Sequence, residues 1–222
     1  MERVRETKLV IFDMDGVVID SENLYYTALV EQAQAMGVPG ITREYYRQFI
    51  GGGNERMVKI IAHDYHSDQL AHDLVWGSID RVGDLVDQGH LELKPGFLTL
   101  TDYLMEHNIP FVLGSSSELS NVKRMLGKLG VYERFDAFIT ADDVQQAKPA
   151  PDIFLKAWEI GGQPDRQQTL IIEDSVNGIK AANAAQIPVI MVPDVLPPTP
   201  ETQKATVAVL DDLVAVRDFI AN

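Results

Sequence analysis

Five short apolar runs, none of them interrupted by a polar residue, are the feature that most constrains the fold of this chain. They are Leu9–Phe12, Phe111–Leu113, Ala137–Ile139, Leu170–Ile172 and Val189–Val192. Continuous runs of this length indicate strands that are buried on both faces, as in a parallel sheet. Between most of these runs, apolar residues recur with helical spacing, for example Phe97, Leu100 and Leu104. This alternation predicts an α/β fold with a doubly wound parallel sheet and right-handed crossovers.

The interval between the first run and Gly96 breaks this alternation and reads as an inserted helical domain. Tyr25 and Leu29 begin one apolar helical face, and Val75 and Ile79 begin another. The run Gly51–Gly53 is expected to interrupt the helices between them. We predict a helical domain over residues 20–92, with residues 1–19 and 93–222 forming the core. Near the carboxyl end, we expect a proline-rich loop over 193–200 and a last helix over 211–220.

Charge and cysteine content exclude several classes of function. The chain has 33 acidic and 19 basic residues and a formal charge of -14, with no basic stripe. It is therefore not expected to bind nucleic acid. It has no cysteine, which removes disulfides, thiolate catalysis and cysteine-type zinc sites and fits a cytoplasmic location. The apolar run near the amino terminus is far shorter than the roughly 20 residues that span a bilayer, so we expect no membrane association. A monomer or weak dimer is expected.

Polar and charged residues follow the predicted strands directly. Asp13 and Asp15 come after the first run, Ser115 and Ser116 after the second, Lys148 after the third with a connector, and Glu173 and Asp174 after the fourth. In open α/β sheets, ligands bind outside the carboxyl ends of the strands. These residues should therefore meet at one edge of the sheet.

Such a meeting of carboxylates has a chemical consequence. Several carboxylates repel one another unless a hard divalent cation neutralises them, and Mg²⁺ is the natural occupant of an oxygen-ligand site. A carboxylate can attack phosphorus to give an aspartyl-phosphate, while a second acid protonates the leaving oxygen and later deprotonates water. Ser115 and Lys148 would hold the transferring oxygens by a hydrogen bond and a positive charge. Taken alone, however, Glu173–Asp174 could be a helix-start pair and Ser115–Ser117 a plain turn.

Four ordered segments resemble the signatures of the haloacid dehalogenase-like hydrolase superfamily. They are Asp13–Glu22, Gly114–Ser115, Lys148–Phe154, and Ile172–Ser175 with Gly178. The similarity extends from about Lys8 to about Val192. One such segment would be weak evidence, but four in the family's order are specific.

The resemblance implies a Rossmann-like core with an inserted α-helical cap domain. By the same similarity, Asp13 is the nucleophile and a metal ligand, and Asp15 is the general acid/base and offers its backbone carbonyl to Mg²⁺. Glu173 and Asp174 complete the metal site. Ser115 and Lys148 bind the phosphoryl group, assisted by the backbone near Ser116.

The subgroup that the chain resembles most contains sugar phosphatases, phosphoglycolate phosphatases and β-phosphoglucomutases. We expect a phosphatase that acts on a small phosphorylated metabolite such as a sugar phosphate. The mutase is the second interpretation, because Tyr25 stands where those mutases place a cap histidine. A phosphonate-cleaving branch would need a cap lysine, for which Lys59 is a poor candidate, and a non-catalytic binding protein is a further alternative. Tyr25, Arg56 and Lys59 are candidate cap residues for substrate binding.

Overall fold

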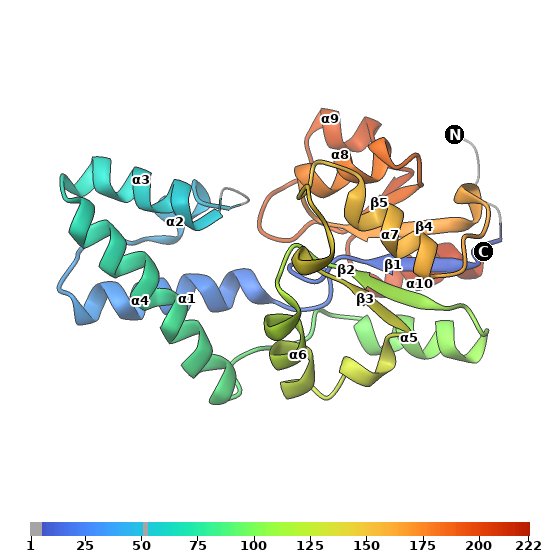
Figure 1. Ribbon diagram of the computed structural model, residues 1–222, viewed down its shortest axis with the longest axis horizontal. Coiled ribbons are helices and arrows are strands. Elements are labelled where there is room, and N and C mark those ends of the chain that lie inside the picture. The colour runs from blue at the N-terminus through green and yellow to red at the C-terminus, as the bar shows by residue number, and fades with distance from the viewer. Residues whose placement is uncertain (1–5, 51–52) are drawn as a thin grey trace. The chain divides into compact units, whose positions relative to one another are not determined.

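The computed structural model describes residues 6–50 and 53–222. Contacts between residues divide the chain into two compact units (Figure 1). The core unit comprises residues 1–19 and 93–222, and the helical unit comprises residues 20–92.

A six-stranded parallel sheet forms the centre of the core unit, with the strand order β3-β2-β1-β4-β5-β6. The strands are β1 (Leu9–Phe12), β2 (Phe111–Gly114), β3 (Ala137–Ile139), β4 (Thr169–Glu173), β5 (Val189–Met191) and β6 (Ala208–Val209). The predicted α/β class and parallel sheet are confirmed, and the five apolar runs coincide with β1 to β5. The strand β6 was not predicted, because it has only two half-buried residues at the edge of the sheet. The sheet order places β1 between β2 and β4, where the direction of strand addition reverses.

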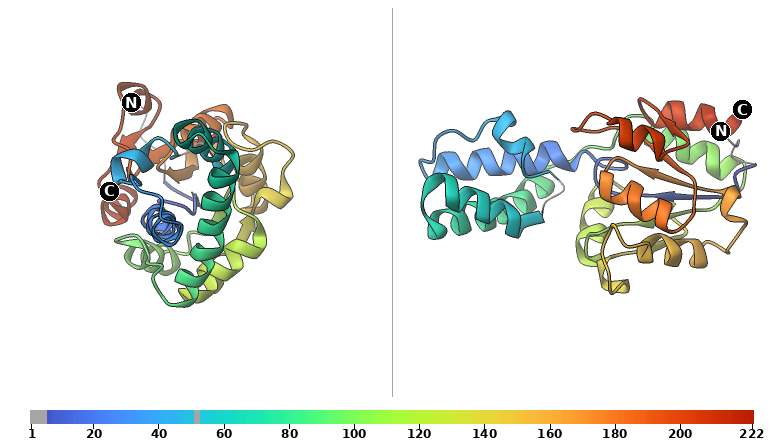
Figure 2. Two further views of the ribbon diagram at one scale, coloured as in Figure 1. Left: turned by 90° about the vertical axis from the view of Figure 1, so that its left-hand side faces the viewer. Right: turned by 90° about the horizontal axis from the view of Figure 1, so that it is seen from above.

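Helices cover both faces of the sheet (Figure 2). Side chains alternate along β1, so that Phe12 packs edge-on against Phe97 on one face, while Leu9 and Ile11 join a cluster with Phe154 on the other. The first face carries α5 (Phe97–Glu106) and α10 (Leu213–Ala221), and the second carries α7 (Asp152–Ile160) and α8 (Val176–Ala184). The remaining core helices are α6 (Leu119–Lys128), α9 (Pro200–Lys204) and the 3-10 turns η1 (Tyr132–Arg134), η2 (Ala141–Asp143) and η3 (Arg166–Gln168).

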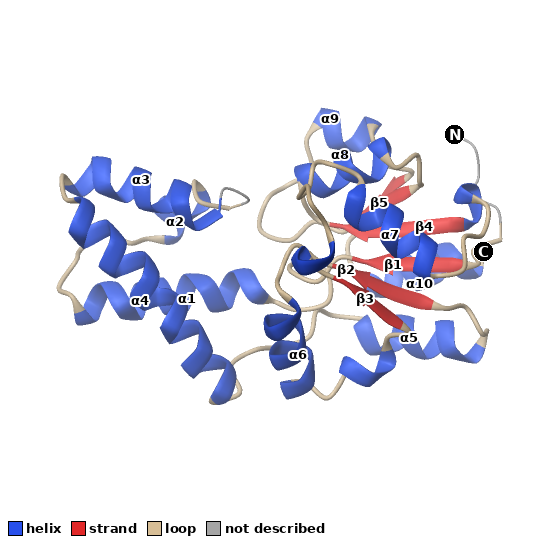
Figure 3. Ribbon diagram, viewed as in Figure 1, coloured by secondary structure: helices blue, strands red, loops and turns tan. Residues whose placement is uncertain are grey.

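The described residues of the helical unit form the helices α1 (Ser21–Ala35), α2 (Arg43–Arg47), α3 (Gly53–Tyr65) and α4 (Asp68–Asp87) (Figure 3). Its core is rich in aromatic residues, because Tyr46 and Phe49 are buried together with Ile61 and Leu74. The expected helix break falls partly outside the described residues, since Gly51 and Gly52 are not among them and α3 begins at Gly53. Within residues 6–50 and 53–222, no helix has both the length and the apolar character needed to cross a membrane.

The two ends of the insertion leave the core unit side by side. Ile19 and Leu93 form an antiparallel bridge, and the Lys94 amide donates to the Val18 carbonyl at 2.9 Å. Both contacts lie in the core unit, so the sheet domain itself holds the two connecting segments together.

Candidate active site

The turn that follows β1 brings Asp13 to the edge of the sheet. The Asp13 amide donates to the Ile172 carbonyl at 3.0 Å, which extends the β1–β4 ladder by one residue and fixes the backbone from which the carboxylate projects. Gly16 has a φ of +75° in this turn, a conformation that glycine adopts without strain. A Cβ at Gly16 would lie 2.4 Å from Asp174 Oδ2, so the turn also needs a glycine in order to approach the end of β4.

Lys148 connects three neighbouring strand ends. Its Nζ donates to Asp13 Oδ1 at 2.5 Å, to Glu173 Oε1 at 2.9 Å and to the Gly114 carbonyl at 3.2 Å. The lysine side chain is only 7% exposed. Burial alone would lower the pKa of Lys148, but the carboxylates of Asp13 and Glu173 outweigh it, and the pKa is raised. Lys148 is therefore a fixed positive charge at the carboxyl edge of the sheet.

Glu173 and Asp174 follow directly along β4. Glu173 is fully buried, and its Oε2 accepts hydrogen bonds from the Ser175 amide at 2.7 Å and the Ser175 hydroxyl at 2.9 Å. The Ser175 hydroxyl also accepts from the Gly178 amide at 3.0 Å and so caps the start of α8. A Cβ at Gly178 would overlap Glu173 Oε1, so this helix start is shaped around the carboxylate.

Carboxylate oxygens of Asp13, Glu173 and Asp174 lie within 4.8 Å of one another. Burial raises the pKa of Asp13 to about 7, and Glu173 and Asp15 add to the shift while Lys148 opposes it. Burial also raises the pKa of Asp174, with further contributions from Glu173, Asp13 and Asp194. Without a cation, this cluster therefore resists carrying its full negative charge.

These residues fit a hard divalent cation. The cluster offers only oxygen donors, and Lys148 supplies a single positive charge against three carboxylates. A cation bound by Asp13 and Asp174 would relieve the repulsion that raises the pKa of both groups.

The serine loop after β2 lies beside Asp15. Ser115 is fully buried, and its hydroxyl accepts from the Ser117 amide at 3.0 Å. The Ser117 hydroxyl donates to Asp15 Oδ2 at 3.3 Å, whereas Ser116 is exposed. Asp15 does not belong to the three-carboxylate cluster. Phosphoryl binding was predicted for Ser115 and Ser116, whereas Ser117 of the same loop was interpreted only as part of a turn.

Two further charged residues that the sequence analysis did not single out lie at this edge. Lys94 Nζ donates to Asp194 Oδ1 at 2.6 Å, and Asp194 is among the charges that raise the pKa of Asp174. Asp194 comes three residues after β5, so the rule that identified Asp13 and Glu173 could also have found it.

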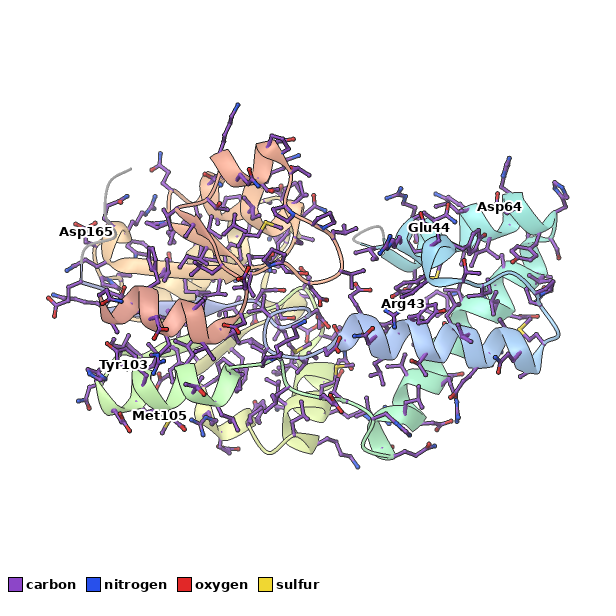
Figure 4. All side chains as sticks on the ribbon, turned by 180° about the vertical axis from the view of Figure 1, so that it is seen from behind. Arg43, Glu44, Asp64, Tyr103, Met105 and Asp165 are labelled. Carbon is purple, nitrogen blue, oxygen red and sulfur yellow. The ribbon has the colours of Figure 1, made fainter. Side chains whose placement is uncertain are left out.

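A cavity of about 150 Å³ is lined by residues of the helical unit. Tyr25, one of the three candidate substrate residues, lines it together with Glu22, Asn54 and Ser78, while its other walls are mostly apolar. Arg56 and Lys59 are exposed on α3 and are not among the lining residues. Arg43, labelled in Figure 4, lies with its guanidinium 4.4 Å from the centre of the Tyr26 ring and donates to Asn23. Charges of this unit therefore lie mainly on its surface.

Comparison with known proteins places this site in a family. The model of the haloacid dehalogenase-like hydrolases matches residues 10–192. Hexitol phosphatase B of Escherichia coli is 29% identical over 215 residues, which cover 96% of this chain and 93% of that protein. A structure described as a putative beta-phosphoglucomutase from Thermotoga maritima is 25% identical with a TM-score of 0.79, covering 96% of this chain and 99% of that one.

The structure of CbbY from Rhodobacter sphaeroides in complex with phosphate is also similar. It is 25% identical with a TM-score of 0.74, and the match covers 95% of this chain and 96% of that one. The family match spans the end of β1, the serine loop, Lys148 and the end of β4, which are the segments that build the cluster described above. The predicted resemblance is confirmed, and the chain belongs to the haloacid dehalogenase-like hydrolases.

Proposed function

We propose that this protein is a magnesium-dependent phosphatase that hydrolyses a small phosphorylated metabolite through an aspartyl-phosphate on Asp13. The observation that carries the proposal is the cluster of Asp13, Glu173 and Asp174 in a hydrolase of this family, in which Asp13 and Glu173 also accept hydrogen bonds from the ammonium group of Lys148. The phosphatase names of similar proteins support it.

In the first half of the proposed reaction, a carboxylate oxygen of Asp13 forms a bond to phosphorus as the bond between phosphorus and the leaving oxygen breaks. Asp15 gives its proton to that oxygen, so the product leaves as a neutral alcohol. Lys148 holds the Asp13 carboxylate in place and offers positive charge to the phosphoryl oxygens.

In the second half, Asp15 takes a proton from water, whose oxygen attacks the same phosphorus and displaces the Asp13 carboxylate. Phosphate is released and both aspartates return to their initial states. Mg²⁺ bound by Asp13, Glu173 and Asp174, with the Asp15 carbonyl as a further ligand, would neutralise charge on the phosphoryl group in both halves.

The helical unit suggests the class of substrate. Its cavity combines the Glu22 carboxylate, the Tyr25 side chain and the Asn54 amide with apolar walls. A carboxylate repels a second phosphate or carboxylate but accepts hydrogen bonds from hydroxyl groups. We therefore propose that this cavity recognises a neutral hydroxylated group, which fits a sugar or polyol phosphate. The name of the hexitol phosphatase relative agrees with this class.

The central test is the Asp13→Asn variant with an aryl phosphate as substrate. Release of phosphate should require Mg²⁺ in the wild-type protein and should fall on the order of 10³-fold or more in the variant. Asp102→Asn is a matched control, because Asp102 lies in the same unit with a side chain that is 61% exposed. Wild-type activity in Asp13→Asn would overturn the assignment of the nucleophile.

The mutase is the second candidate, because one similar structure is described as a putative beta-phosphoglucomutase. Formation of glucose 6-phosphate from β-glucose 1-phosphate would favour it over hydrolysis. A panel of sugar phosphates, polyol phosphates and phosphoglycolate tests the substrate class. Preference for phosphoglycolate, whose distal group is a carboxylate, would contradict the role given to Glu22. If the protein neither hydrolyses nor transfers phosphate from any of these compounds, the interpretation as a non-catalytic binding protein remains.

A further inference from the structure

An ion pair between Lys94 and Asp194 is buried beside the carboxylate cluster. The side chains are 17% and 7% exposed, and Lys94 Nζ lies 2.6 Å from Asp194 Oδ1. Burying two charges carries a desolvation cost that their mutual attraction repays only in good geometry with further hydrogen bonds. The position of this pair therefore calls for a further partner.

That partner is missing at one oxygen of Asp194. Among the residues that the structure describes, none provides a hydrogen-bond partner for Asp194 Oδ2, although this oxygen is buried. An unsatisfied buried acceptor is costly, and for a carboxylate the cost is larger than for a neutral group.

The orphan oxygen faces the cluster. A Cβ at Gly16 would lie 3.2 Å from Asp194 Oδ2 and 2.4 Å from Asp174 Oδ2, so the two carboxylates flank the same space above Gly16. Only a cation or a hydrogen-bond donor can occupy the space between two carboxylate oxygens favourably. The arrangement thus points to something that is bound beside Asp174.

We propose that Lys94 and Asp194 form a positioning pair for the divalent-ion site, in which Asp194 Oδ2 accepts a hydrogen bond from a water molecule on the ion. This inference rests on the metal site of the proposed function. Groups that hydrogen-bond to the ligands of a metal orient them and tune its affinity.

Lys94 fixes the other oxygen of the carboxylate. Its own backbone is held by the hydrogen bond from its amide to Val18 and by the bridge between the neighbouring Leu93 and Ile19. The lysine therefore projects from a fixed segment and orients Asp194, whose charge adds to the field at the ion.

Direct titration with Mn²⁺ or Mg²⁺ of the full chain, by calorimetry or electron paramagnetic resonance, tests the pair without relying on activity. Asp194→Asn should weaken ion binding about tenfold to a hundredfold. Lys94→Gln keeps a donor to Asp194 and removes a positive charge, so it should tighten ion binding several-fold. A purely structural pair would not shift the affinity in opposite directions in the two variants.

Glu31→Gln is the matched control, because it breaks the ion pair of Glu31 with Arg81 in the helical unit and should leave the ion affinity unchanged. Unchanged affinity in Asp194→Asn, or weaker binding in Lys94→Gln, would overturn the inference. Should Asp194→Asn fail to fold, as judged by circular dichroism, Lys94→Gln still decides the question. Failure of the wild-type protein to bind either ion would instead overturn the metal site of the proposed function, and this inference with it.

Discussion

The two units of this protein differ in where their charged side chains lie. In the core unit, the buried side chain of Lys148 forms ion pairs with the buried carboxylates of Asp13 and Glu173, and the pKa of Asp13 rises to about 7. In the helical unit, ion pairs such as Arg47–Glu44 lie on the surface, while the interior is filled by aromatic and aliphatic side chains. Buried charge is thus concentrated at the proposed active site. It lowers the stability of the core unit, whereas the helical unit has no comparable loss.

The largest difference between the units is expected for lysine and arginine replacements. Lys148→Met leaves the buried carboxylates of Asp13 and Glu173 without a counter-charge, so in a chelator it should lower the free energy of unfolding by about 3–5 kcal/mol. The phosphatase rate should fall about 10²- to 10³-fold, because a donor to the phosphoryl oxygens is lost.

Arg81→Met in the helical unit removes an ion pair whose two side chains are partly exposed, so its unfolding free energy should fall far less than that of Lys148→Met. Urea denaturation measures both variants. Equal losses in the two would break the contrast between the units.

A smaller difference is expected for glycine replacements inside helices. Gly178→Ala places a methyl group on Glu173, whose carboxylate is held by Lys148 and Ser175, and should destabilise the protein by about 1–3 kcal/mol or more. In Gly77→Ala the atoms nearest to the new methyl all belong to the flexible Gln32 side chain, which can move, and alanine favours the helix. Its unfolding free energy should stay within about 1 kcal/mol of wild type. If urea denaturation finds Gly77→Ala to be more destabilising than Gly178→Ala, Glu173 can move away from the new methyl group and the start of α8 is not rigid.

The next difference between the units is expected in how stability depends on pH when a chelator removes divalent ions. Asp13 has a pKa of about 7 in the folded protein, above the ordinary value of an aspartate, so the folded state binds its proton more tightly than the unfolded state does. Protonation of Asp13 therefore stabilises the folded state at low pH, and this stabilisation is lost as the pH rises from about 4 to about 7. The thermal midpoint should fall over this range, and the fall should be smaller in Asp13→Asn. Asp64→Asn in the helical unit, where the aspartate is exposed, should keep the wild-type slope.

A hydrogen bond inside the helical unit gives the last test of the comparison. The Tyr46 hydroxyl donates to Glu22 Oε2 at 2.7 Å, and its ring packs against Tyr26 and Phe49. Tyr46→Phe keeps the ring packing and loses one hydrogen bond to a carboxylate, so it should cost about 1–3 kcal/mol at most in thermal or urea unfolding. A larger loss would show that the helical unit also depends on an ionic contact.

Sequence patterns predicted the core unit well because its site is built by a rule of the fold. In a parallel sheet, residues that directly follow the strands gather at one edge, so Asp13, Ser115 and Glu173 could be located from the apolar runs alone. The contact of Lys94 with Asp194 was missed, since it joins segments a hundred residues apart and has no local pattern.

The helical unit was less predictable. We predicted its extent from the interruption of the strand–helix alternation, and the short helix α2 was not predicted. Arg56 and Lys59 were selected for their charge near a glycine run, whereas the phase of α3 exposes both and turns Met57 toward the cavity. Helical phase depends on packing against α1 and α4, which the local sequence does not specify.

The bridge between Ile19 and Leu93 bears on how such proteins diversify. Because the insertion departs from and returns to adjacent positions on the sheet domain, the sheet can close whatever length of chain is placed between those positions. Exchange of residues 20–92 for another module would leave the strand order intact, so the recognition that we propose for the helical unit could be replaced as one segment while Asp13, Lys148 and Glu173 keep their places.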